Sequence, residues 1–183
     1  MSVPLTIFID QYTGALLVGV SAGVAVLVSV SIFAPLIEEF SKAFPLFYRH
    51  GETERSIFKL ALLVGVGFGL IEFLTYVLLL KVPVIDRLPG LFFHPASTSI
   101  TAYGIATKRP GRYYAAAVAL HFSNNLLSLT FGTIWFASPM PLFSSIVIVA
   151  LTVALSWQLF GKTKERIIGL TTVPAETKLP VAP

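Results

Sequence analysis

The sequence predicts an all-α protein, a polytopic bundle of five to six transmembrane helices. Of its 183 residues, 55% are hydrophobic and 12% are charged, and the mean hydropathy is +0.83, whereas a soluble domain has about 25% charged residues. Most charged residues fall between uncharged runs of about 20 residues, the length of one bilayer crossing. These observations exclude a cytosolic enzyme. The lack of cysteine excludes disulfides, thiolate metal sites and thiol nucleophiles.

The first apolar segment, residues 14–48, is too long for one straight crossing. Because it contains Pro35 and Pro45, it is either one tilted, kinked span or two helices. One span is favoured, since nothing polar enough to form a loop separates its halves. The remaining spans are expected at residues 57–80, 91–107, 113–136 and 142–160.

The chain is expected to form a single transmembrane domain over residues 1–160. Residues 161–183 are polar and contain proline, which predicts a disordered cytoplasmic tail. Within the domain, the glycines Gly19, Gly23, Gly65, Gly67 and Gly69 have the spacing of close helix packing, which is favoured over a catalytic role.

Positive charge is distributed unequally between the two sets of loops. Only Lys81 and Arg87 lie on one side; the ten on the other are Arg49, Arg55, Lys59, Lys108, Arg109, Arg112, Lys162, Lys164, Arg166 and Lys178. By the positive-inside rule the C-terminus is cytoplasmic and, with five spans, the N-terminus is outside. The net charge of +4 is therefore explained by orientation in a lipid bilayer, and no nucleic-acid partner is expected.

Eight polar residues interrupt the apolar segments: Glu38, Glu39, Lys42, Glu72, His94, His121, Asn124 and Asn125. An ionisable group at the bilayer centre costs at least ~2.5 to 3.5 kcal/mol, so several of them in one small protein are expected to meet. A structural explanation for each residue alone is an interhelical hydrogen bond or an ion pair, such as one between Glu39 and Lys42.

Four of these residues, one per span, are predicted to lie in one layer. Glu38, Glu72, His94 and His121 are 9 to 14 residues from a flanking cytoplasmic basic residue, which corresponds to depths of about 14 to 21 Å. Two pairs also share a helix face at a spacing of four residues, His121 with Asn125 and Glu38 with Lys42. The shared depth favours a single buried site.

Several familiar hydrolase chemistries do not fit this set of residues. No His-Glu-x-x-His spacing occurs, and the aspartates Asp10 and Asp86 lie at segment ends. Ser21 lies in a formal nucleophile-elbow motif, but a helical protein has no sheet to strain the turn. Water activated by glutamate and histidine remains, with histidine and asparagine as hydrogen-bond donors to the oxyanion.

Four motifs follow one another, one per helix: Glu38-Glu39-x-x-Lys42, Phe68-x-x-x-Glu72, His94-x-x-x-Thr98 leading to Gly104, and His121-x-x-x-Asn125. In this order and placement the chain resembles the PrsW family of intramembrane proteases over residues 35–127. That family is similar to the broader CAAX-processing and bacteriocin-processing (CPBP) membrane proteases.

The resemblance implies metal-free cleavage of a peptide bond in a membrane-protein or membrane-anchored peptide substrate. Glu38 and Glu39 would be at the catalytic centre, with Glu38 as the base, and His121 and Asn125 would donate to the oxyanion. The broader family has histidine where this chain has Glu72, so His94 is expected to take over water activation. Lys42, Glu72, Thr98 and Asn124 would support the site.

Other interpretations stay open at this point. Glu39, Glu72, His94 and His121 would form a plausible Zn²⁺ ligand set for the same hydrolysis, with Glu38 as a substitute for Glu39. The same layer would also suit a proton or cation pathway, although no inverted repeat is found. A third alternative is a non-catalytic scaffold resembling the APH subunit of gamma-secretase. The sequence does not determine the oligomeric state.

Overall fold

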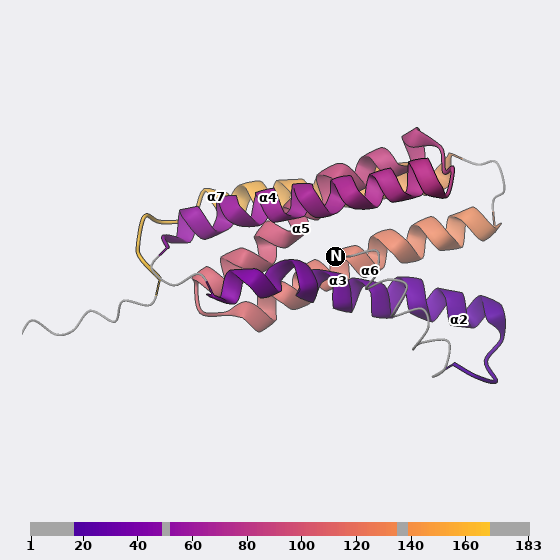
Figure 1. The fold of residues 1–183 in the computed structure, drawn as a ribbon, viewed down its shortest axis with the longest axis horizontal. Helices are drawn as coiled ribbons and strands as arrows, with labels where there is room; N and C mark the ends of the chain where they lie inside the picture. The colour runs from indigo at the N-terminus through magenta and orange to yellow at the C-terminus, as the bar shows by residue number, and fades with distance from the viewer. Residues whose placement is uncertain (1–16, 49–51, 135–138, 169–183) are drawn as a thin grey trace, which may run out of the picture.

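The computed structural model describes residues 17–48, 52–134 and 139–168, and it is all-α as predicted (Figure 1). Its α-helices are α2 (Ala22–Val28), α3 (Ala34–Ala43), α4 (Glu54–Leu74), α5 (Val84–Ala106), α6 (Pro110–Ile134) and α7 (Met140–Phe160). Within the described ranges the only β-type pairing is one isolated bridge between Thr53 and Ile167.

The first apolar segment forms one continuous helical run in its described part. The run covers Ala22–Tyr48, because α2 passes into α3 through a π-helical turn (η1, Ser29–Phe33) and α3 ends in a 3-10 turn (η2, Phe44–Tyr48). Pro35 follows η1 and Pro45 lies in η2, as expected of residues that cannot donate a backbone hydrogen bond. The expected tilted or kinked single segment is thus one irregular helical run in the described residues, without a loop between its halves.

The protein is a membrane protein with transmembrane helices. Among the residues that the structure describes, three helical runs are long and apolar enough to cross a bilayer: Ala22–Tyr48, Glu54–Leu79 and Met140–Phe160. The prediction of five to six spans is thus supported for three of them. The other two long helices, α5 with 23 residues and α6 with 25, are less apolar, and α5 in particular carries a run of buried polar residues from His94 to Thr101.

Helix α5 is at the centre of the bundle. It contacts α3, α4, α6 and α7, and Figure 1 shows it crossing between the layer of α4 and α7 and the layer of α3 and α6. Its polar residues Ser97, Thr98, Ser99 and Thr101 are all buried. The low hydropathy of α5 therefore reflects burial among other helices instead of contact with lipid.

Close packing of α4 on α5 depends on two of the predicted glycines. A Cβ atom on Gly65 would lie 2.3 Å from Pro95 Cα, and one on Gly69 would lie 3.3 Å from the His94 ring. Gly19, Gly23 and Gly67 have no such neighbour within 4 Å among the described residues. The packing role is therefore confirmed at Gly65 and Gly69 only.

The first residues after α7 are held against the start of α4, although a disordered tail was expected from residue 161. The buried Glu54 carboxylate accepts hydrogen bonds from Arg166 Nη2 at 2.9 Å and from the Lys164 backbone N–H at 3.1 Å. The Ile168 N–H donates to the Glu52 carbonyl at 2.8 Å. These bonds order residues 161–168, which we call the C-terminal strap; the rest of the predicted tail lies outside the described residues.

We expect Gly65→Ala to destabilise the protein and Gly67→Ala to be neutral or slightly stabilising. Both changes raise helix propensity, but only the methyl group at Gly65 meets the backbone of α5, and such overpacking costs roughly 1 to 3 kcal/mol. Thermal unfolding in detergent, followed by circular dichroism, measures the difference. Equal melting temperatures for the two variants would contradict the close approach of α4 to α5.

Candidate functional site

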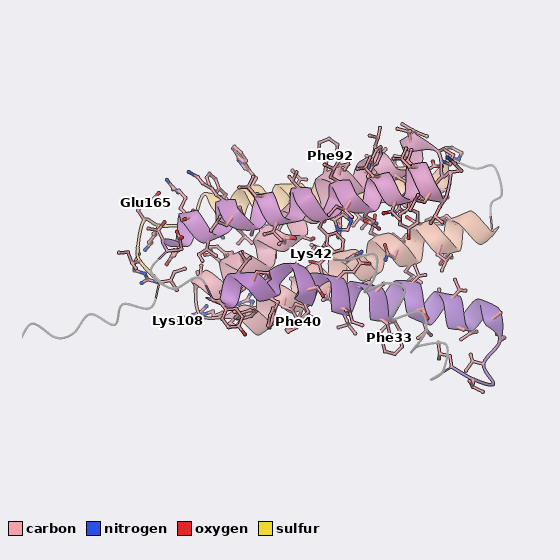
Figure 2. The ribbon with its side chains drawn as sticks, viewed as in Figure 1. Phe33, Phe40, Lys42, Phe92, Lys108 and Glu165 are labelled. Carbon is pink, nitrogen blue, oxygen red and sulfur yellow. The ribbon has the colours of Figure 1, made fainter. Side chains whose placement is uncertain are left out.

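Six of the predicted polar side chains converge inside the bundle. Glu38, Glu39 and Lys42 come from α3, Glu72 from α4, His94 from α5 and His121 from α6. Figure 2 shows Lys42 between the helices, whereas Phe40 and Phe92 point outward, where 49% and 62% of their surfaces are exposed. The predicted layer of polar groups is therefore one connected cluster.

Glu39 is the centre of this cluster and is completely buried. Its Oε1 atom accepts hydrogen bonds from Lys42 Nζ at 2.6 Å, from Ser97 Oγ at 3.1 Å and from His121 Nδ1 at 2.8 Å. Since a carboxylate can only accept, the His121 proton in this bond is on Nδ1. The lone pair of His121 is then on Nε2.

Glu38 faces this free nitrogen. Its Oε2 atom lies 3.9 Å from His121 Nε2, which is too long for a direct hydrogen bond but short enough for one water molecule to bond to both atoms. Within the described part of the chain, Glu38 Oε2 is a buried atom with no hydrogen-bond partner. The two groups are thus placed to polarise one water between them.

His94 is engaged at both ring nitrogens. Its Nε2 atom forms a close hydrogen bond with Glu72 Oε2, and its Nδ1 atom lies 3.2 Å from Lys42 Nζ. Because an ammonium has only protons to give, Nδ1 accepts and Nε2–H donates to Glu72. His94 therefore has no free lone pair in this arrangement. The position expected of His94, beside the water to be activated, is occupied by His121.

Glu72 is also held by a residue that the sequence interpretation assigned only to a loop. Arg87 Nη2 lies 2.8 Å from Glu72 Oε1, and the guanidinium is 3.6 Å from the centre of the Tyr76 ring. Ser97 was missed as well. Helical spacing was the available signal for both, because Arg87 and Ser97 lie seven residues before and three residues after His94, on the same helix face.

Three predicted site residues do not contact the carboxylates. Asn125 Nδ2 donates to the Val30 carbonyl at 2.9 Å, and Thr98 Oγ1 donates to the His94 carbonyl at 2.7 Å. Asn124 Oδ1 accepts from Ser145 Oγ at 2.9 Å. In this arrangement these hydrogen bonds join the side chains to helices, and Asn124 and Asn125 also line the polar cavity beside His121.

A polar cavity of about 310 Å³ adjoins the cluster. Glu72, His94 and His121 line it, and its wall also includes Val82 before α5 and Pro141 at the start of α7. The cavity therefore extends from the buried cluster toward the end of the bundle opposite the C-terminal strap.

The proposed Zn²⁺ ligands do not gather around one point. Glu39 bonds to His121, Glu72 bonds to His94, and the Lys42 ammonium lies between the two pairs. Over residues 17–48, 52–134 and 139–168, no group of three or more histidine, aspartate and glutamate side chains is arranged to hold a metal. A fixed positive charge among these side chains also opposes a cation.

No protein-family model, curated protein or solved structure matches this chain. The resemblance to PrsW proteases therefore depends on the four motifs alone.

We expect Glu39→Gln and Lys42→Met each to lower the free energy of unfolding, and the double variant to lower it by less than the sum. Removing one partner of a buried pair leaves the other charge uncompensated, at a cost of about 3 to 5 kcal/mol. Unfolding of the detergent-solubilised variants measures this coupling.

The pair Arg55 and Glu165 is the matched control, because its atoms are 3.6 Å apart with 38% and 65% of the side chains exposed. Its coupling is expected to be below about 1 kcal/mol. Additive effects of the Glu39 and Lys42 substitutions on the free energy of unfolding would show that the two side chains do not stabilise each other.

Proposed function

We propose that this protein is an intramembrane endopeptidase that hydrolyses a peptide bond of a membrane-associated polypeptide, using water activated by Glu38 and His121. The observation that carries the proposal is the buried arrangement in which Glu39 holds His121 Nδ1, so that Nε2 faces Glu38 at 3.9 Å. The PrsW resemblance supports the same assignment, and membership of that family is part of the proposal.

In the proposed reaction one water molecule donates hydrogen bonds to Glu38 and to His121 Nε2. Glu38 takes a proton as the water oxygen forms a bond to the scissile carbonyl carbon, whose π electrons move to the carbonyl oxygen. The C–N bond breaks when this intermediate collapses, and the leaving nitrogen receives the proton from Glu38. Glu39 fixes the His121 tautomer throughout, as the carboxylate of a catalytic triad does.

The orientation in the membrane is also a proposal. Lys108 and Glu165 lie at the same end of the bundle in Figure 2, and the strap residues Lys164 and Arg166 bond there to Glu54. By the positive-inside rule this end is cytoplasmic, together with the C-terminus. The N-terminus and the Val82 and Pro141 side of the cavity are then outside.

A specific observation favours proton-coupled transport as the second candidate function. Ionisable groups form a continuous series through the bundle, in the order Arg87, Glu72, His94, Lys42, Glu39, His121 and Glu38. Chains of this kind form proton relays in pumps and transporters. Proteolysis is preferred because a relay does not require a Glu38 Oε2 atom that lacks a direct hydrogen bond and faces the lone pair of His121.

We expect Glu38→Gln and His121→Ala to reduce cleavage at least ~100-fold, because each change removes one of the two groups that polarise the water. The assay reconstitutes the protein into liposomes with solubilised host membrane proteins and detects new N-termini by mass spectrometry. The control Glu165→Gln changes a carboxylate on the strap and should retain the wild-type pattern of cleavage.

Circular dichroism must show that both variants keep their helical content. Retained cleavage in either variant would remove the proposed mechanism. Loss of wild-type cleavage on chelation, restored by added Zn²⁺, would instead support the metal-dependent alternative.

A second measurement separates transport from hydrolysis. Liposomes loaded with a pH-sensitive dye should show no protein-dependent proton flux, because in this proposal the series of ionisable groups positions the catalytic side chains and does not conduct protons. A flux that is present in the wild type and lost in Glu72→Gln would favour transport.

A further inference from the structure

The turn that joins α2 to α3 leaves the Val30 carbonyl without a helical donor. In η1 the Ala34 N–H donates to the Ser29 carbonyl, five residues back. The next residue is Pro35, which has no N–H. The Ala34 N–H, which would pair with the Val30 carbonyl in an α-helix, is therefore used by Ser29, and the residue five ahead of Val30 is Pro35, which has no N–H to offer.

The side chain of Asn125 supplies the missing donor. Its Nδ2 atom lies 2.9 Å from the Val30 oxygen, and because a carbonyl only accepts, the nitrogen of the amide must face it. An unpaired carbonyl within the hydrocarbon region is costly, and Asn125, which also lines the polar cavity, pairs this one. The bond thus joins α6 to a point of the first helical run where the helical hydrogen-bond pattern is interrupted.

This bond lies next to the site. Asn125 is one turn beyond His121 on α6, and Glu38 and Glu39 are eight and nine residues beyond Val30. On the other side of His121, the Tyr114 hydroxyl donates to the Leu36 carbonyl at 2.6 Å. Two bonds to backbone carbonyls therefore hold α6 against the first run, before and after His121.

We infer that Asn125 is a positioning residue, which sets His121 against Glu38 and Glu39 by satisfying the Val30 carbonyl that Pro35 leaves unpaired. Its effect on cleavage rests on the function proposed above, whereas its effect on the geometry of the site does not. This role differs from the oxyanion contact that the motif resemblance implies for Asn125.

The test asks whether a second substitution on the first helical run restores what Asn125→Leu removes. Asn125→Leu removes the donor, and adding Pro35→Ala returns a backbone N–H that can reach Val30, five residues back, in the pattern of Ala34 and Ser29. Asn124→Leu is the matched control, because its lost bond is to Ser145 on α7. Each Asn→Leu variant is compared with and without Pro35→Ala, and Pro35→Ala alone is the reference.

Three readouts are followed in detergent or liposomes. They are the melting temperature, the ¹⁵N resonances of the His121 ring, and the kcat for any cleavage site found in the assay above. Asn125→Leu is expected to lower the melting temperature by several degrees, shift the His121 Nδ1 resonance and reduce kcat at least tenfold with little change in KM. Pro35→Ala is expected to restore most of each change, but not the losses caused by Asn124→Leu.

Two results would overturn the inference. One is loss of cleavage in Asn125→Leu with an unchanged melting temperature and His121 spectrum, which would place Asn125 on the substrate. The other is a defect of Asn125→Leu that Pro35→Ala does not restore although the infrared measurement described next shows the Val30 carbonyl hydrogen-bonded in the double variant; a restored N–H that bonds to Ser31 instead, four residues back, makes that infrared measurement on Asn125→Leu the deciding test.

If Pro35→Ala alone does not fold, isotope-edited infrared spectroscopy of the ¹³C-labelled Val30 carbonyl replaces the rescue. Loss of the bond in Asn125→Leu raises its stretching frequency, and an unchanged frequency would also overturn the inference. If no cleavage occurs in the wild type while the spectroscopic rescue is seen, the proposed function fails and the positioning role stands.

Discussion

A carboxylate that is sealed from water inside a membrane protein needs partners from several helices, and Glu39 is the group for which this requirement is strictest. Three donors converge on one of its oxygens, and they come from α3, α5 and α6. Because the attraction between buried charges is strong only when the geometry is close, these helices must lie at fixed separations. Lys42 extends the same constraint to His94, and through His94 to Glu72 on α4.

Helix α5 makes this arrangement possible. Its contacts with α3, α4, α6 and α7 keep its hydroxyl-bearing residues away from lipid, and the missing side chain at Gly65 lets the backbone around Pro95 approach α4 closely. The His94 ring is thereby brought within reach of Glu72. Polar residues would be costly in a helix that faces lipid. They are tolerated in α5 because neighbouring helices, and not lipid, surround it.

Much of this could be predicted from sequence, because hydropathy and depth depend only on position along the chain. The positions of Glu38, Glu72, His94 and His121 at similar depths correctly indicated one cluster. The ion pair between Glu39 and Lys42 could be anticipated from their spacing, and it is present. The partners on other helices could not be predicted, because they depend on the rotation of each helix about its axis: Glu39 also bonds to His121, and the lone pair expected on His94 is on His121. The chain after residue 160 was also interpreted too simply, since its polar composition does not reveal that Arg166 and Lys164 bond to Glu54.

The C-terminal strap has a mechanical consequence for the whole bundle. It joins the end of α7 to the beginning of α4. Near this end both helices also pack on α5, through the buried residues Phe58, Ile100 and Leu159. Helices α4, α5 and α7 are therefore joined at one end by hydrogen bonds as well as by side-chain packing. The boundary between α3 and α6 is held by single hydrogen bonds, from Tyr114 to the Leu36 carbonyl and from His121 to Glu39, and its contacts are less extensive than those of α4 with α5. The packing that encloses the site is therefore unequal around the circumference of the molecule.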